Sequence, residues 1–249
     1  MAPFGAVARV QYQNIAETYQ AGRDSIAQLA AWRSVISFPD TDQIRVVDVG
    51  SGTGIFVRAW SSWGATHVVG VDPSAVMLGE AVRIGMPESA CQIVGRAEQL
   101  PLQANSYDAA WLSTVIHHLE DRRACVGEIG RLLVPGGRVY IRGYFADLSW
   151  IDWIDYFPGR ERALARFPSA REVIDDFVTE GFNLVKTDIV QGPRASVASV
   201  RTWIETMRHA DTLLTAFTDS EIAAGLKTLE DRRPESLGSG LHLITLHWG

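Results

Sequence analysis

Short apolar runs alternate with amphipathic segments along the first part of this chain. Five runs are short and mostly apolar, a pattern typical of strands that are buried on both faces of a parallel sheet. The predicted strands are IRVVDVG (44–50), HVVGVD (67–72), CQIVGR (91–96), YDAAWLST (107–114) and GRVYIRGYF (137–145).

Segments with apolar residues at helical spacing separate several of these strands. They predict helices over 24–37, 74–85 and 122–133, and Asp24 stands where a cap of the first helix is expected. The turn at Pro135-Gly136-Gly137 opens the last of the five strands. Strands joined by right-handed helical crossovers predict an α/β fold with a doubly wound open sheet.

Beyond residue 145 the regular pattern loosens. A helix is predicted over 168–182, closed by Gly181, and two more strands over 182–190 and 241–249. A helical insertion at about 196–231 separates these two strands. We expect one domain with a cap, built on seven strands, because the late helices interrupt a single sheet.

Composition and charge narrow the function classes. The 249 residues carry a formal net charge of -6, with 47% hydrophobic and 21% charged residues. A nucleic-acid partner is not expected, because it would need a basic stripe. The start of the chain lacks a signal peptide, and no apolar run approaches the ~20 residues that span a bilayer. We therefore expect a cytoplasmic protein that does not bind membranes.

A glycine-rich loop, VVDVGSGTGIF (46–56), follows the first predicted strand. Its glycines, Gly50, Gly52 and Gly54, are spaced G-x-G-x-G, which differs from the G-x-G-x-x-G fingerprint of dinucleotide-binding folds. A P-loop is not indicated, since no lysine stands in or after the loop. Such a loop lets a ligand lie against backbone N–H groups, because glycine has no Cβ. Asp48 precedes the loop at the strand end.

Asp72 ends the second strand, about twenty residues after the loop, where a carboxylate can accept both ribose hydroxyls of an adenosine. With these features the chain resembles the class I S-adenosylmethionine-dependent methyltransferases of the small-molecule type related to the ubiquinone and menaquinone methyltransferases. The resemblance covers residues from about 44 to 145. It is carried by VVDVGSGTG (46–54), VVGVDPSAVML (68–78), GRAEQLPLQANSYDAAWLSTVIHHLED (95–121) and EIGRLLVPGGRVYI (128–141).

The resemblance implies a Rossmann-like sheet whose last strand is antiparallel. It implies S-adenosylmethionine as cofactor, S-adenosylhomocysteine as product and a small-molecule methyl acceptor, with the protein a monomer or a homodimer. Residues 1–37 are then a helical cap, in which YQNIAETYQAGR (12–23) resembles the helix that closes over the cofactor. Residues 44–145 are the cofactor-binding core, and residues 146–249 contain the substrate-side lid and the last two strands.

Cofactor contacts follow from the resemblance by position. Arg23 would pair with the carboxylate of the methionyl group. Arg96 stands where the family often has an aspartate at the adenine edge, which leaves the backbone of Ala97 to serve there. The implied cofactor-binding residues are Tyr12, Tyr19, Arg23, Asp48, Gly50, Gly52, Gly54, Asp72, Pro73, Met77, Ala97, Glu98 and Ser113.

Two adjacent histidines, His117 and His118, follow the fourth strand at the edge where open α/β sheets bind ligands. Histidine suits general-base work, and we favour His117 because adjacent side chains point in different directions. A structural role is the alternative. Metal binding is not expected, since nothing nearby completes a tetrahedral set. Arg142, a charged residue in a central strand, either faces the pocket as a third catalytic candidate or pairs with a carboxylate such as Asp147.

An aromatic cluster after the fifth strand lies where this family builds its substrate lid. Core packing is the alternative interpretation of the same residues. The candidate substrate-binding residues are Tyr144, Trp150, Trp153, Tyr156 and Trp203.

The predicted function is methyl transfer, by in-line displacement, to an O, N or C atom of a small aromatic or hydrophobic metabolite. This is a transferase activity of the kind found in biosynthesis. The alternatives are methylation of a peptide or another macromolecule, and a cofactor-bound protein that promotes a rearrangement or cyclisation instead of methyl transfer.

Overall fold

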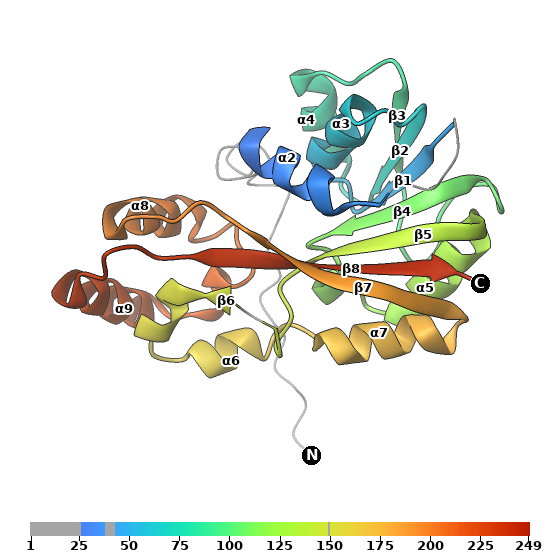
Figure 1. Cartoon of the computed structure of the whole chain (residues 1–249). Helices are drawn as coiled ribbons and strands as arrows, with labels where there is room; N and C mark the ends of the chain where they lie inside the picture. The colour runs from blue at the N-terminus through green and yellow to red at the C-terminus, as the bar shows by residue number, and fades with distance from the viewer. Residues whose placement is uncertain (1–25, 38–42, 149) are drawn as a thin grey trace. The chain divides into compact units, whose positions relative to one another are not determined.

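The structure is a computed structural model that describes residues 26–37, 43–148 and 150–249. Their contacts divide the chain into two compact units (Figure 1). The sheet unit comprises Asp24–Trp150, Phe167–Gly192 and Gly240–Gly249, and the helical unit comprises Ile151–Arg166 and Pro193–Ser239. The expectation of a single domain with a cap stays a prediction.

Eight strands form one sheet in the order β3-β2-β1-β4-β5-β8-β6, and β7 pairs with β8. Strands β1 to β5 are parallel, whereas β8 is antiparallel to both β5 and β7. The predicted doubly wound α/β fold with an antiparallel last strand is therefore confirmed. The strands are β1 (Arg45–Val49), β2 (His67–Asp72), β3 (Ala90–Val94), β4 (Tyr107–Ser113), β5 (Leu133–Gly143), β6 (Trp150–Ile151), β7 (Phe182–Gln191) and β8 (Ser239–Trp248).

The sheet has one strand more than the seven that the sequence predicts, and the additional strand is β6. Strand β6 contains two residues, which is too short for any alternation of apolar and polar positions to be visible. Strand β5 begins four residues earlier than predicted and runs through the turn at Pro135. Its register with β4 shifts between Tyr107 and Ala109, so the turn is a bulge within the strand.

Helices cover both faces of the sheet within the sheet unit (Figure 1). The predicted helices are found within one to three residues of their expected ends. Helix α3 is missed by the sequence pattern, because its eight residues are too few for helical spacing to repeat. One face carries α2 (Ile26–Val35), α3 (Ile55–Ser62) and α4 (Ala75–Ile84), and the other carries α5 (Arg122–Leu132) and α7 (Ala170–Thr179).

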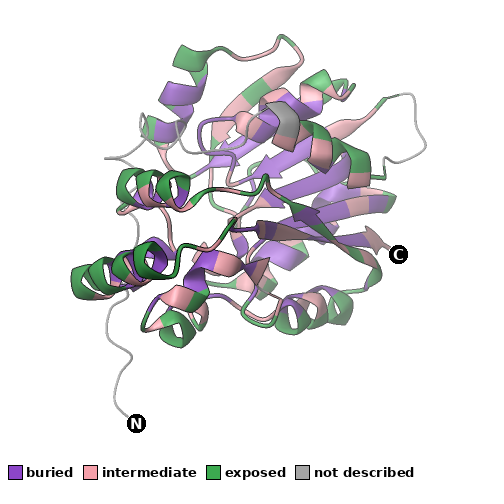
Figure 2. Cartoon of the chain, turned by 60° about the vertical axis from the view of Figure 1, so that its left-hand side comes forward, coloured by how far each residue is buried: buried purple, intermediate pink, exposed green. Residues whose placement is uncertain are grey.

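Apolar side chains fill the space between the sheet and the helices, and the central strands are almost entirely buried (Figure 2). On the α2 and α3 face the core is aromatic, with Trp60, Trp111 and Tyr140 in mutual contact at 5.6–6.2 Å between ring centroids. On the α5 and α7 face it is mainly aliphatic. This rigid support fixes the carboxyl ends of the parallel strands at one edge of the sheet.

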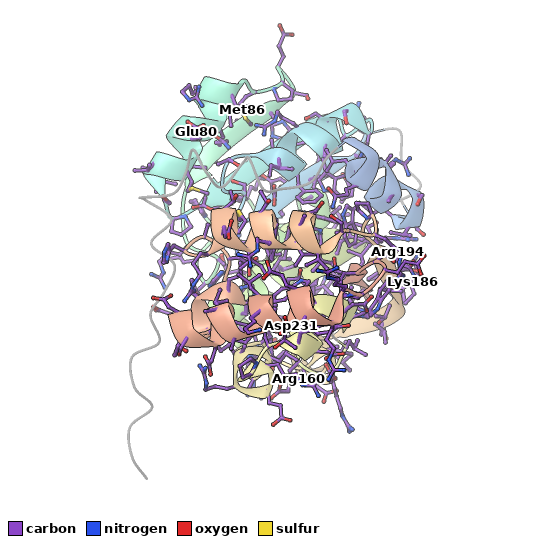
Figure 3. All side chains as sticks on the ribbon, turned by 90° about the vertical axis from the view of Figure 1, so that its left-hand side faces the viewer. Glu80, Met86, Arg160, Lys186, Arg194 and Asp231 are labelled. Atoms are coloured by element: carbon purple, nitrogen blue, oxygen red, sulfur yellow. The ribbon has the colours of Figure 1, made fainter. Side chains whose placement is uncertain are left out.

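The helical unit contains helices in the stretch where the sequence predicts a helical insertion. Its longest helix begins with a capping box, in which Thr218 and Glu221 bond reciprocally to each other's backbone N–H groups. Charged residues occupy its outer surface, for example Asp231, whose Oδ2 accepts a hydrogen bond from Lys227 at 2.6 Å (Figure 3). The unit contains the 3-10 helices η3 (Asp152–Tyr156) and η4 (Leu214–Ala216) and the helices α6 (Arg160–Leu164), α8 (Val197–Met207) and α9 (Asp219–Arg232).

None of the helices in the described part of the chain is both long enough and apolar enough to cross a membrane.

Candidate functional site

The glycine loop turns sharply between β1 and α3. Gly50, Gly52 and Gly54 adopt φ values of 73°, 53° and 74°, which lie in the left-handed region that favours glycine. At Gly50 a side chain is also excluded by space, because a Cβ would lie 2.3 Å from Cγ2 of Val115. The sequence GSGTG is therefore required by the conformation of the loop.

Asp72, at the end of β2, holds this loop in place. One carboxylate oxygen accepts the backbone N–H of Gly52 at 2.9 Å, and the other accepts the N–H of Ser74 at 2.8 Å. The side chain of Ser74 in turn caps α4 by accepting from the N–H of Met77. One carboxylate thus joins the glycine loop to the start of the next helix.

Two carboxylates, those of Asp48 and Asp72, are buried beside the loop. Burial raises the pKa of Asp48 well above its ordinary value, and the charge of Asp72 raises it further. Burial also raises the pKa of Asp72, although the two backbone N–H groups that it accepts oppose this effect. A negative potential at a buried site is suited to a cationic ligand.

Met77 and the glycine loop are in close proximity. The Met77 side chain is buried, and its Cε would lie 3.3 Å from a Cβ added at Gly52. The neighbouring Pro73 is exposed. Met77 thus lies against the loop, and the assignment of both residues to the adenine stays a prediction.

The segment after β3 is held by charged contacts. Glu98 accepts the backbone N–H of Glu120 at 3.2 Å, and Arg96 approaches Glu98 at 3.5 Å and Glu120 at 3.0 Å. Arg96 is more than half exposed, and Ala97 beside it is half-buried. The carboxylate of Glu98 is thus used within the protein, where it ties the β3 end to the segment before α5.

Strand β4 ends at Ser113, and the chain then turns abruptly. Thr114 has a φ of 56°, an uncommon value for a β-branched residue, and its N–H donates to the Arg142 carbonyl at 2.8 Å. This turn leads directly into the 3-10 helix η2 (Ile116–His118). Backbone strain of this kind is concentrated at functional sites.

Both histidines lie in η2, at the edge formed by the carboxyl ends of the parallel strands. Their rings contact each other at 4.0 Å between centroids. His117 also packs against Phe167 at 4.7 Å, and Tyr144 meets the same phenyl ring at 5.9 Å. One histidine and one tyrosine of the predicted site are therefore brought together around Phe167.

Arg142 is buried in the sheet unit, with 4% of its surface exposed. Its guanidinium donates to Oγ of Ser113 at 2.8 Å and lies over the rings of Trp32 and Phe56, at 4.7 and 5.0 Å. Asp147 instead accepts the N–H of Ala170 at the start of α7. Among the described residues no ion pair joins Arg142 to Asp147, so this proposed partner is not used.

The remaining aromatic candidates belong to different parts of the chain. Trp150 packs beside Gly240 in the sheet unit. Trp153 contacts Trp203 at 5.8 Å in the helical unit, where the half-buried Tyr156 also lies. Their assignment to the substrate stays a prediction.

Tyr12, Tyr19 and Arg23 lie outside the described residues. Within 26–37, 43–148 and 150–249, no group of three or more His, Cys, Asp or Glu side chains could hold a metal ion.

Several residues of the site are missed by sequence reasoning. Val115 closes over Gly50, Trp32 and Phe56 sandwich Arg142, and Thr114 takes the strained turn. No local pattern marks these residues, since their roles depend on neighbours distant in sequence. Only Phe56, which directly follows the glycine loop, carries a positional signal.

Comparison with known proteins agrees with this geometry. Residues 47–141 match a family described as a methyltransferase domain. An uncharacterised methyltransferase of Mycobacterium bovis is 34% identical over 119 residues, which are 47% of this chain and 47% of that protein. The chain thus matches about half the length of this relative.

Solved structures show the same fold. A methyltransferase in a complex with the Trm112 activator of Haloferax volcanii aligns with a TM-score of 0.67 and 18% identity, covering 96% of this chain and 98% of that one. The [4+2]-cyclase SpnF aligns with a TM-score of 0.62 and 19% identity, covering 91% of this chain and 83% of that one. The family match lies in the part of the chain where the sequence shows its resemblance to the methyltransferases, and the fold agrees with it. The relation to the ubiquinone and menaquinone enzymes stays a prediction.

Proposed function

We propose that this chain is a class I S-adenosylmethionine-dependent methyltransferase, which uses S-adenosylmethionine as cofactor and transfers its methyl group to a small-molecule acceptor. The observation that carries the proposal is the glycine loop fastened to Asp72. Glycines lack the Cβ that would keep a ligand away from the backbone, and the carboxylate is held at the edge of the sheet where such folds bind nucleotides.

The residues present fit this cofactor. Each oxygen of Asp72 accepts one backbone N–H, and a carboxylate has about four acceptor positions, so it can also accept ribose hydroxyls. The negative charge of Asp72 beside the loop favours a cation nearby. Met77 offers an apolar surface beside the loop for the adenine ring.

When bound, the cofactor supplies a methyl group on a positively charged sulfur, which is an already activated donor. The protein then needs to align the acceptor and exclude water. Ser113 and the turn at Thr114 fix the end of β4, and Arg142 positions Ser113 from β5. His117 takes the proton that an O–H or N–H acceptor releases, while His118 and Phe167 restrict the orientation of its ring.

The acceptor is expected to be partly aromatic or hydrophobic. Phe167 and Tyr144 present rings beside His117 within the sheet unit.

The test compares two glycine substitutions at positive φ. Gly52→Ala puts a methyl group into the proposed cofactor site, where the nearest atom is the flexible end of Met77. Gly64→Ala also acts at a positive φ, 104°, but in open space after α3. We expect Gly52→Ala to weaken S-adenosylmethionine binding about tenfold or more in calorimetry, and Gly64→Ala to leave it unchanged.

Methyl transfer is measured with methyl-labelled cofactor and a panel of phenols, amines and carboxylic acids. Label should appear in an acceptor with wild-type protein, and much less with Gly52→Ala. Equal cofactor affinity for both variants would contradict the proposed cofactor site. Tight cofactor binding without transfer to any acceptor would contradict the activity.

A second candidate function is a rearrangement or cyclisation without methyl transfer. It is favoured by the similarity in fold to SpnF, a [4+2]-cyclase. Cofactor that remains unconsumed while an added substrate is rearranged would support this candidate.

A further inference from the structure

A buried glycine and a histidine form a pair at the carboxyl end of β5. Gly143 stands opposite His242 of β8 in the antiparallel register. Side chains of directly opposed residues share one face of a sheet. On this face the next pair along the two strands is Ile141 with Ile244, which belongs to the core beneath α5 and α7.

Space is left open above Gly143. The residue is buried, yet no described atom lies within 4 Å of the position that its Cβ would take. Gly50 and Gly70, in contrast, would have a Cβ within 2.7 Å of a neighbouring side chain. Close packing therefore does not explain why glycine stands at position 143.

The imidazole of His242 has one nitrogen available. Its Nε2 is buried and has no hydrogen-bond partner among the described residues, whereas the ring bonds to the backbone of Leu148. Burial lowers the pKa of His242, and the Leu148 bond and the charge of Asp147 oppose this effect. In the neutral ring that donates one N–H to a carbonyl, the other nitrogen is an acceptor.

Leaving a buried acceptor without a donor costs free energy, so such a group calls for an explanation. Gly143 follows Arg142, which bonds to Ser113 at the end of β4, where the proposed methyl transfer takes place. The open space and the unused nitrogen thus lie on the strands that carry the proposed site.

We propose that His242 and Gly143 form a subsite for the methyl acceptor, in which Nε2 of His242 accepts a hydrogen bond from a neutral hydroxyl group and Gly143 provides the space. This inference rests on the proposed function and identifies the acceptor as a molecule with a hydroxyl donor. His242 is then a specificity residue, distinct from His117, and the transferred proton does not pass through it.

The test uses two probes that differ in one hydrogen-bond donor. Phenol carries the hydroxyl, and anisole is the same ring with the hydroxyl methylated. The protein, saturated with S-adenosylhomocysteine, is labelled with ¹⁵N in its six histidines, and the spectrum of His242→Gln assigns the ring. We expect Nε2 of His242 to be unprotonated at neutral pH, and phenol but not anisole to shift its resonance.

Two pairs of variants separate binding from folding. The amide of glutamine can replace Nε2, and that of asparagine can replace only Nδ1, so His242→Gln should keep phenol affinity within about threefold while His242→Asn loses about tenfold. Gly143→Ala should weaken phenol binding, whereas Gly127→Ala, another glycine beside open space, should not. All four variants should bind S-adenosylhomocysteine normally.

A protonated Nε2, no phenol-specific shift, or equal phenol affinity of the Gln and Asn variants would each overturn the subsite. Cofactor binding and labelled methyl transfer by the wild-type protein are measured separately. The subsite can therefore fail while the proposed function stands, and the reverse is also observable.

Discussion

The carboxylate of Asp48 is buried almost completely beneath the glycine loop. A charge in this place opposes folding, because desolvation favours the neutral form and the nearby charge of Asp72 adds repulsion. The cost is compatible with a function in which a cationic cofactor compensates for the negative charge. Stability without a bound cation is thus reduced at the proposed cofactor site.

A first prediction concerns the pH dependence that follows. Because the pKa of Asp48 is raised on folding, the folded state binds a proton more tightly than the unfolded state. Its favourable contribution is fully present below the ordinary pKa of an aspartate and is lost as the pH rises through the raised pKa. Asp48→Asn should therefore gain stability relative to wild type as the pH rises.

Urea unfolding of both proteins from pH 4 to pH 8, followed by tryptophan fluorescence, measures this difference. The free energy of unfolding of Asp48→Asn minus that of wild type should increase with pH and then level off. Parallel curves for the two proteins would show that Asp48 keeps an ordinary pKa in the folded state.

Among the elements, the turn between β4 and η2 is the most unusual. Thr114 adopts a left-handed conformation, and its hydroxyl donates to the carbonyl of Ser113 at 2.7 Å. Such a conformation costs roughly 1–2 kcal/mol for a residue with a Cβ, and asparagine tolerates it better than most. Asn105, also at a positive φ, illustrates this preference in the same chain.

A second prediction follows for this turn. Thr114→Asn should raise the free energy of unfolding by about 1 kcal/mol, because it keeps a Cβ but relieves the left-handed strain. Thr114→Ala serves as the control, since alanine also loses the hydroxyl but lacks the tolerance of asparagine for this conformation, and it should gain less. Thermal and urea unfolding of the three proteins provide the measurement. The explanation would be contradicted if the Asn variant were less stable than the Ala variant.

The elements differ in how far the sequence predicts them. Strands β1, β2 and β4 are predicted because their buried runs are continuous. The positions of the residues at the strand ends can then be predicted as well. Asp72 could be placed beside the glycine loop for this reason, as parallel strands end at one edge. Helix α3 and strand β6 are too short to show a period.

Side chains whose role depends on a distant neighbour escape the sequence. Arg142 could be recognised as an expensive charge in a buried strand, but not as a cation stacked on Trp32 and Phe56. His242 looks like any polar position in the last strand until its partner Gly143 is known. Contacts of this kind bring together residues about one hundred positions apart, and no local pattern encodes them.

At the scale of the whole molecule, the two units differ in whether the methyltransferase family match covers them. The family match at residues 47–141 lies within the sheet unit, and so do the glycine loop, Asp72 and the η2 histidines. The helical unit lies outside this match. The family match therefore contains the proposed cofactor site, whereas Trp153 and Trp203, two of the candidate substrate residues, lie outside it.

The last prediction tests the sheet unit as the place where the cofactor acts. A ligand at one hundred times its dissociation constant stabilises the state that binds it by about 2.7 kcal/mol. S-adenosylhomocysteine should therefore slow hydrogen exchange of the β1, β2 and β4 amides, which report the opening of the sheet, by about one hundredfold where global unfolding limits exchange. Gly52→Ala at the same ligand concentration should show much less protection, and Gly64→Ala the full effect. Equal protection in wild type and Gly52→Ala would place the ligand elsewhere in the molecule, because only a site against the glycine loop makes the two variants differ.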